Sequence, residues 1–124
     1  MIYGHGIDMV EIRRIREILD REGSRFETRV FSADEIAYCR GQKDPFPSFA
    51  ARFAAKEAFG KALGLGILTS GPPQQIEVIR DDRGAPLMRL TGAPLEHLQK
   101  LGAQKALVSL AHEGDYAIAS VILV

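Results

Sequence analysis

The chain has 124 residues and no net charge, with 16 Lys plus Arg against 16 Asp plus Glu. This length suits one domain and is too short for an enzyme with separate cofactor and substrate lobes. A net charge of zero disfavours a nucleic-acid-binding protein, and a hydrophobic content of 46% disfavours disorder. A single cysteine excludes an internal disulfide. No apolar run approaches a membrane span and the start does not resemble a signal peptide, so we expect a soluble, cytoplasmic protein.

The N-terminal half predicts one strand followed by three helices. Residues 2–8 form a short strand, and a helix with isoleucines on one face then runs to Gly23. The sequence Ser-Ala-Asp-Glu at 32–35 is a capping box, which predicts a helix to about residue 40. Two prolines predict a loop over 41–47, after which Ser48 caps the strongest helix, over 48–63.

The C-terminal half predicts two hairpins separated by a helix. A long loop over 65–74 leads to strands at 75–80 and 87–90 around a glycine turn. A helix begins at 92–94 and ends at Gly102, and strands at 105–112 and 116–124 form the last hairpin. This order predicts an α+β fold in which one domain, residues 1–124, packs a largely antiparallel sheet on a long central helix.

The central helix separates its side chains in an unusual way. One side is lined by alanines, whereas the other interleaves phenylalanines with Arg52 and Lys56. The alanine side suits close packing on a sheet, and the mixed side suits the wall of a cleft. Glu57 and Lys61 have the spacing of a weak surface ion pair, worth about 0.3–0.5 kcal/mol. Arg52 and Lys56 have the same spacing, and two like charges there favour an anion between them.

Three further residues are candidates for chemistry. Asp8 is either the N-cap of the first helix or a carboxylate aimed at a cation, and spacing alone does not decide. With Glu57 it suits Mg²⁺, which commonly takes one or two protein carboxylates and completes its shell with water and phosphate. His112, at a strand end, is either structural or a phosphate contact together with Ser109.

Three segments of the chain resemble the holo-acyl-carrier-protein synthases, the short bacterial group of the 4'-phosphopantetheinyl transferases. They are GIDMVEIRRI at 6–15, FAARFAAKEAFGKALG at 49–64 and SLAHEGDYAIASV at 109–121. The resemblance implies a 4'-phosphopantetheinyl transferase-like fold. It also implies transfer of 4'-phosphopantetheine from coenzyme A to a serine of apo-acyl carrier protein, with release of 3',5'-ADP.

The resemblance also implies roles for individual residues. The metal ligands fall on Asp8 and Glu57, and the catalytic positions on Glu57 and Lys61. Contacts to the coenzyme fall on Arg52, Lys56, Lys61, Gly64, Ser109 and His112. Two residues depart from the family pattern, since Ala111 replaces a second serine and Leu65 replaces a threonine. Glu57 or a metal-bound water would act as the base, and Lys61 would neutralise developing charge.

The expected partners follow from the same resemblance. The carrier protein is acidic in this family, and Arg14 and Arg21 lie on the solvent side of the first helix, although they also suit a solvated face neutralised by nearby acids. The final strand is apolar on both faces, which suits either a buried central strand or a subunit interface, and the family's short members are homotrimers with shared active sites. Two alternative functions stay open: a Mg²⁺-dependent nucleotide phosphohydrolase and a non-catalytic module that binds coenzyme A.

Overall fold

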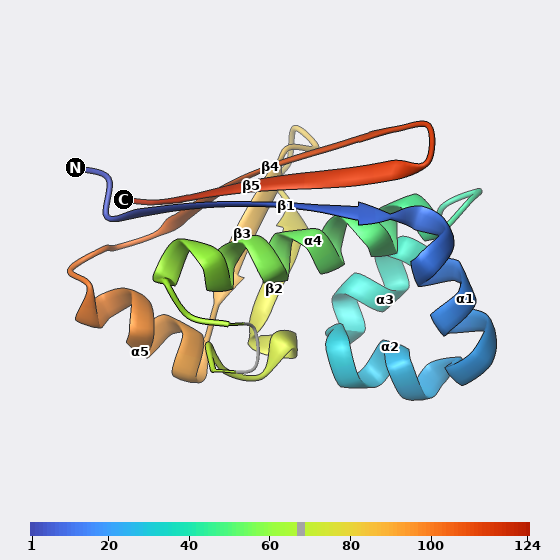
Figure 1. Cartoon of the computed structure of the whole chain (residues 1–124), viewed down its shortest axis with the longest axis horizontal. Coiled ribbons are helices and arrows are strands. Elements are labelled where there is room, and N and C mark those ends of the chain that lie inside the picture. Colours follow the sequence, from blue (N-terminus) through green and yellow to red (C-terminus); the bar gives the residue numbers. More distant parts are fainter. Residues whose placement is uncertain (67–68) are drawn as a thin grey trace.

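A three-stranded antiparallel sheet lies over one long helix, α4, which forms the centre of the molecule (Figure 1). This computed structural model describes residues 1–66 and 69–124. The sheet has the order β1-β5-β4, and these elements are β1 (Gly4–Glu11), β4 (Ala106–Glu113), β5 (Tyr116–Leu123) and α4 (Phe46–Leu63). The predicted α+β class, with an antiparallel sheet packed on a long central helix, is confirmed.

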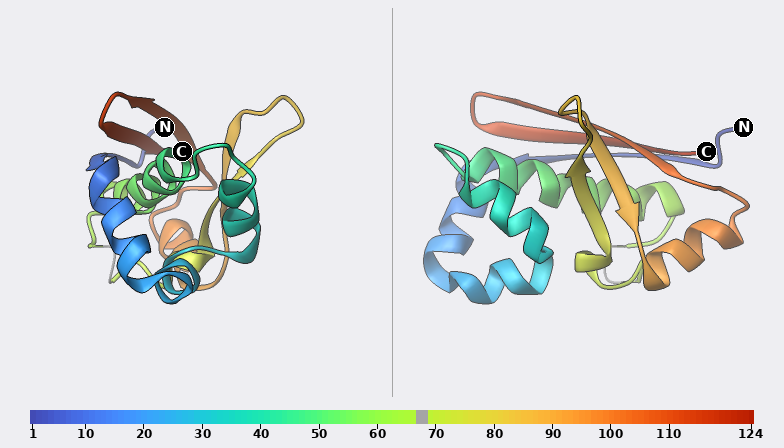
Figure 2. Two further views of the ribbon diagram at one scale, coloured as in Figure 1. Left: turned by 90° about the vertical axis from the view of Figure 1, so that its right-hand side faces the viewer. Right: turned by 180° about the vertical axis from the view of Figure 1, so that it is seen from behind.

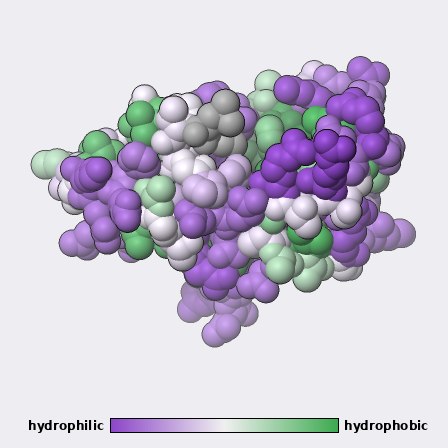
Figure 3. Space-filling model, turned by 90° about the horizontal axis from the view of Figure 1, so that it is seen from below, coloured by the Kyte–Doolittle hydropathy of each residue, from purple (hydrophilic) through white to green (hydrophobic). Residues whose placement is uncertain are grey.

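The other elements surround α4 on the side away from the sheet. Three short helices gather below one end of α4, a two-stranded hairpin crosses its middle, and the last helix lies near its other end (Figures 1 and 2). These elements are α1 (Ile12–Glu22), α2 (Ser24–Val30), α3 (Ala33–Arg40), η1 (Pro73–Gln75), β2 (Ile76–Arg80), β3 (Pro86–Leu90) and α5 (Gly92–Lys100). The face of the molecule below them is mostly hydrophilic, with smaller hydrophobic patches (Figure 3).

Local sequence signals placed several of these elements correctly. Ser32 Oγ accepts a hydrogen bond from the backbone N–H of Glu35 at 3.2 Å, and Glu35 Oε1 accepts one from the N–H of Ser32 at 3.1 Å. The predicted capping box is therefore complete. Gly64 ends α4 with φ of 77°, a left-handed conformation that glycine adopts without strain. Both predicted hairpins form.

Other boundaries differ from the predictions. β1 continues to Glu11, which is itself the N-cap of α1, so Asp8 lies within the strand and is not a helix cap. The helix α2 was not predicted. α4 begins at Phe46 instead of after Ser48, because Pro47 falls in the first helical turn, where a missing N–H costs nothing. The loop predicted over 65–74 includes residues 67 and 68, which lie outside the described residues.

The helix α4 is enclosed on nearly all sides. Its alanines are buried, as the predicted packing on a sheet requires, and they are Ala50, Ala51, Ala54, Ala55, Ala58 and Ala62. Phe49 and Phe59 are also fully buried on the opposite side. The Phe31 ring links α4 to the short helices, with its centroid 5.0 Å from that of Phe49 and 6.0 Å from that of Phe26. The mixed side of α4 is therefore partly core, whereas Phe53 and Glu57 on or beside it stay half-buried.

The contact between α4 and β1 is closer than any side chain would allow. A Cβ atom on Gly6 would lie 2.0 Å from the carbonyl oxygen of Ala58, and one on Gly4 would lie 2.1 Å from that of Ala62. Real Cβ atoms do not approach backbone this closely, so both positions require glycine for lack of space. This packing sets the distance between the helix and the strand that carries Asp8.

The opposite face of the sheet has no helix over it (Figure 1). β5 alternates between buried residues, which face α4, and half-buried ones, which face outward. Val121 is on the inner face and Ile122 on the outer face. Outward-facing residues include Ile7 and Met9, which are 51% and 61% exposed. The described residues thus leave an apolar sheet face open to solvent.

Two further observations concern the described residues as a whole. None of their helices is both long enough and apolar enough to cross a membrane. Cys39 in α3 is completely buried, and burial raises the pKa of its thiol to about 11.

We predict that Gly6→Ala destabilises the protein by about 1–3 kcal/mol or more, because α4 must move away from β1. Gly41→Ala is the matched control. Gly41 has φ of −76°, and its new Cβ would make ordinary contacts at 3.4 Å, so a change within about 0.5 kcal/mol is expected. Denaturant unfolding of both variants measures the difference, and equal stabilities would contradict the steric argument.

Candidate functional site

Asp8 and Lys61 form an ion pair where β1 packs on α4. Asp8 lies on the inner face of β1, like Gly6 and Val10, so its carboxylate points toward the helix. Lys61 Nζ lies 2.9 Å from Asp8 Oδ1 and also donates to the carbonyl oxygen of Ile7 at 3.1 Å. The Lys61 side chain is 55% exposed and that of Asp8 is 17% exposed. Lys61 thus pairs with Asp8 rather than forming the weak helical pair with Glu57.

Glu57 lies close to this ion pair, one helical turn before Lys61. Partial burial raises the pKa of the Glu57 carboxyl group, and the nearby negative charge of Asp8 raises it further. The positive charges of Lys61 and Arg14 act in the opposite direction. The structure therefore brings together three predicted residues, Asp8, Glu57 and Lys61, with two carboxylates that repel each other.

This arrangement fits a divalent cation. No group of three or more His, Cys, Asp or Glu side chains in residues 1–66 and 69–124 is placed to hold a metal ion. A pair of carboxylates is sufficient for Mg²⁺, which keeps several waters and binds phosphate oxygens. Burial contributes most to the raised pKa of Glu57, and the repulsion from Asp8 that adds to it is one that such a cation would relieve. Lys61, on a flexible and exposed side chain, is free to turn from Asp8 toward a phosphate.

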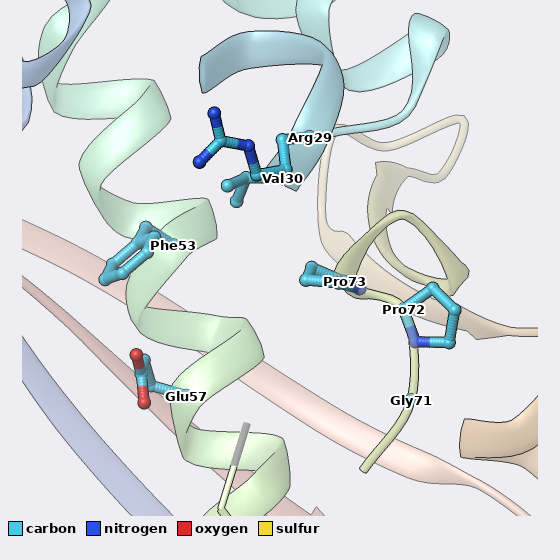
Figure 4. A pocket seen from close by; sticks show the side chains of 7 residues that line it. All are labelled: Arg29, Val30, Phe53, Glu57, Gly71, Pro72 and Pro73. Atoms are coloured by element: carbon cyan, nitrogen blue, oxygen red, sulfur yellow. The ribbon is translucent and has the colours of Figure 1, made fainter. Parts of the chain in front are cut away.

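A pocket opens beside Glu57, between α4, the end of α2 and the turn before β2 (Figure 4). Its volume is about 520 Å³. We call it the Glu57 pocket, and its lining residues are Arg29, Val30, Phe53, Glu57, Gly71, Pro72 and Pro73. Phe53 and Glu57 line it from α4, and the two prolines line it from the turn before β2 (Figure 4). The lining is mostly apolar, with one carboxylate from Glu57 and one guanidinium from Arg29, which suits a long, largely uncharged ligand ending in a charged group.

Lys56 does not face this pocket. Its side chain is fully buried, and Nζ donates to Glu35 Oε1 at 2.8 Å and to the carbonyl oxygens of Pro73 and Ile76 at 2.9 and 2.6 Å. An ammonium group has three protons, and all three are used. The expected direct contact between Lys56 and a coenzyme is thus corrected, since the anion that offsets its charge is Glu35.

Arg52 is buried in a different way, because two of its nitrogens have no partner. Its guanidinium stacks on the Tyr38 ring, with Cζ 4.3 Å from the ring centroid, and Nη1 donates to the carbonyl oxygen of Ser48 at 3.4 Å. Nε and Nη2 are buried, and neither has a hydrogen-bond partner within residues 1–66 and 69–124. A buried charge left partly unpaired is costly, so these donors indicate a site for an anion.

A second pocket, of about 320 Å³, is lined in part by Arg52. We call it the Arg52 pocket, and it is lined by Tyr38, Ser48, Arg52, Arg80 and His112 among others. Sequence reasoning missed Tyr38 and Arg80, because their position against Arg52 depends on tertiary packing. The Arg52 pocket and the Glu57 pocket share no lining residue.

The structure separates Ser109 from His112. They lie on opposite faces of β4, since side chains alternate along a strand, and Ser109 points to the open face of the sheet. Ser109 is paired in register with Ser120, and His112 with Ala117. A single subunit therefore does not place both on one phosphate. Gly64 caps α4 beside Lys61, and a Cβ there would meet no atom of the described residues within 4 Å.

The first helix presents a basic face. Arg14 and Arg21 are exposed, as predicted. Arg21 Nη2 lies 3.6 Å from Glu22 Oε2, whereas the ion pairs of the described residues do not include Arg14. Arg14 is near enough to Glu57 to lower the pKa of that carboxyl group. Arg14 therefore lies between the solvent face of α1 and the carboxylate cluster.

Comparison with known proteins agrees with this geometry. The sequence model of the 4'-phosphopantetheinyl transferase superfamily matches residues 4–121. The chain belongs to this superfamily, as the three sequence segments predicted. A holo-[acyl-carrier-protein] synthase of Geotalea daltonii is 42% identical over 123 residues, covering 99% of this chain and 98% of the relative. One from Shewanella denitrificans is 47% identical over 122 residues, covering 98% and 97%.

Solved structures show the same fold. The crystal structure of holo-[acyl-carrier-protein] synthase from Neisseria meningitidis has a TM-score of 0.90 and 32% identity, covering 99% of this chain and 98% of that one. The enzyme from Helicobacter pylori, solved in complex with coenzyme A, has a TM-score of 0.85 and 32% identity, covering 97% and 99%.

We predict that Glu57→Gln changes the pH dependence of stability in metal-free buffer. The raised pKa means that the folded state disfavours the carboxylate, so stability falls as pH rises from the ordinary carboxyl pKa through the raised one. Glutamine does not ionise, so above this pH window the variant is more stable relative to the wild type than it is at low pH. Below the window this difference in stability disappears. Thermal unfolding from pH 4 to 8 measures this, with Glu96→Gln on α5 as the exposed control. Parallel curves for Glu57→Gln and wild type would contradict it.

Proposed function

We propose that this chain is a holo-acyl-carrier-protein synthase, with residues 1–124 acting as one transferase domain. It transfers 4'-phosphopantetheine from coenzyme A to a serine of apo-acyl carrier protein and releases 3',5'-ADP. The observation that carries the proposal is the cluster of Asp8, Glu57 and Lys61, of which Glu57 lines the Glu57 pocket. Family membership and the relatives named for this activity support it. A cytoplasmic location, which the single cysteine suits, is part of the proposal.

Asp8 and Glu57 would hold Mg²⁺, and Lys61 would bind the coenzyme's pyrophosphate. The metal would supply charge stabilisation at the phosphoryl group and the leaving group. Lys61 would release Asp8 and neutralise the charge that develops on the phosphate oxygens. Glu57 would accept the proton of the carrier's serine, directly or through a water, and its raised pKa brings it closer to the range of an effective base.

The Glu57 pocket would receive the pantetheine arm. This arm joins the phosphate that is attacked and carries no charge along most of its length. Glu57 and Lys61 hold the charged end, so the arm would extend from them along Phe53, Val30 and the two prolines. An apolar lining suits it because little polar surface would be left without a partner.

The Arg52 pocket would bind a phosphate at the other end of the coenzyme. The unpartnered Nε and Nη2 of Arg52 point to an anion, and His112 lines the same pocket. Because this pocket is separate from the Glu57 pocket within one chain, we propose that the two act on one coenzyme from neighbouring subunits. The exposed apolar face of the sheet supports a homotrimer as the assembly that brings them together.

Replacement of Asp8 or Glu57 is expected to abolish transfer while leaving a folded protein. Asp8→Asn and Glu57→Gln each remove a metal ligand, at a cost of several kcal/mol, so turnover at limiting Mg²⁺ falls about a hundredfold or more. Mass spectrometry of apo-acyl carrier protein with coenzyme A measures it, with Glu96→Gln as control. Release of 3',5'-ADP by the wild type without carrier protein would favour the phosphohydrolase, and binding of coenzyme A without any transfer would favour the non-catalytic module.

Arg14→Ala is expected to raise KM for the carrier protein about threefold to tenfold and to leave KM for coenzyme A unchanged. Arg14 is exposed, lacks an ion-pair partner among the described residues and lies near Glu57, so it would meet acidic side chains of the docking carrier. Steady-state kinetics at low and high salt measures the effect, which salt should weaken. A change confined to coenzyme A would place Arg14 in the coenzyme site instead.

Mixed oligomers test whether sites are shared. Arg52→Met removes a poorly satisfied charge, so it is expected to fold with near-normal stability yet bind coenzyme A weakly. If each site takes Glu57 from one subunit and Arg52 from the next, random mixing of Arg52→Met with Glu57→Gln restores roughly a quarter of the sites. Light scattering confirms the trimer mass. A mixture as inactive as both parents, or an active monomer, would overturn the shared site.

A further inference from the structure

We propose that Lys56 is a positioning residue for the coenzyme, because it fixes the width of the Glu57 pocket and thereby the affinity for the pantetheine arm. The inference rests on the proposed function, since it requires that this pocket receive the arm. Lys56 would act through the protein, without touching the coenzyme.

The pocket wall opposite α4 is a short turn that is anchored by Lys56. Gly71, Pro72 and Pro73 form this wall, and Phe53 and Glu57 line the same pocket from α4 (Figure 4). Proline has no N–H, so hydrogen bonds to carbonyl oxygens must hold this part of the turn. Such a hydrogen bond reaches the carbonyl oxygen of Pro73, and its donor is Lys56 Nζ at 2.9 Å.

Lys56 holds this wall against the part of α4 that carries Glu57. It directly precedes Glu57 in the helix, and its second hydrogen bond, of 2.6 Å, reaches the carbonyl oxygen of Ile76 at the start of β2. The two bonds fix both ends of η1, the turn between the pocket wall and the strand. A shift of Lys56 would therefore change the gap between Pro73 and Glu57 directly.

Glu35 makes this anchor rigid. Its Oε1 accepts from Lys56 Nζ at 2.8 Å, and its Oε2 accepts from the backbone N–H of Val78 at 3.0 Å. Both side chains are fully buried. A buried ion pair of this kind contributes little net stability compared with apolar side chains of similar size, so a geometric role explains its presence better. Its hydrogen bonds tie α3, α4 and β2 to the pocket wall.

A second, weaker contact holds the same turn against α2, whose last residues form another wall of the pocket. Gln74 Nε2 donates to the carbonyl oxygen of Thr28 in α2 at 2.8 Å. Arg29 and Val30, at the end of α2, line the pocket. Gln74 is only half-buried and uncharged, so its replacement tests the width of the pocket without leaving a charge in the core.

The test compares two ligands that differ by the arm. Coenzyme A contains the pantetheine arm and 3',5'-ADP lacks it, so a change in pocket width should alter the binding of the first alone. Calorimetric titration of both ligands is applied to the wild type, Gln74→Ala, the double variant Lys56→Met/Glu35→Gln and the control Gln99→Ala on α5. The double variant removes both buried charges together, and light scattering verifies that each protein keeps the wild-type mass.

We expect Gln74→Ala to weaken coenzyme A binding about threefold to fivefold, and the double variant about tenfold or more, with 3',5'-ADP within twofold of wild type. Gln99→Ala should change neither. Equal weakening of both ligands would reduce Lys56 to a structural role, and unchanged coenzyme A binding in Gln74→Ala would overturn the inference even if the double variant does not fold. A wild type that transfers phosphopantetheine but binds both ligands equally would also overturn it, whereas absence of transfer would refute the proposed function instead.

Discussion

The close approach of α4 to β1 is the constraint on which the rest of the structure depends. Without side chains at Gly4 and Gly6, the backbone carbonyls of α4 lie almost against the strand. This contact brings Asp8, from near the start of the chain, within 2.9 Å of Lys61 and close enough to Glu57 to raise its pKa. A wider spacing would separate Asp8 from both side chains of α4. The carboxylate cluster is thus a product of backbone packing.

Two buried cations on the same helix face show how hydrogen bonding distinguishes a structural charge from one that is open to a ligand. Lys56 and Arg52 are one turn apart and both inaccessible to solvent. Lys56 has every proton bonded within the chain, whereas Arg52 keeps two unpartnered donors beside a pocket. Folding tolerates such an unsatisfied guanidinium only at a cost, which stacking on Tyr38 reduces. Satisfaction of hydrogen bonds, more than charge or spacing, separates the two roles.

Most of the fold, and the central part of the site, could be predicted from the sequence, because local signals were strong. The capping box at Ser32, the end of α4 at Gly64 and both hairpins follow from neighbouring residues. The exposure of Arg14 follows from helical periodicity. The burial of Lys56 could not be predicted, since it depends on Glu35, 21 residues earlier in the chain. The separation of Ser109 from His112 was accessible from strand alternation alone.

The buried thiol of Cys39 is a native chemical probe of local unfolding around α3. With a pKa of about 11 and no exposed surface, the thiol is nearly inert toward disulfide reagents while α3 stays packed. Any labelling therefore measures how often α3 separates from the core, on the timescale of hydrogen exchange. Because α3 also carries Glu35, the labelling rate records opening of the helix that anchors Lys56. The Cys39 sulfur thus reports on the opening of α3 without an introduced probe.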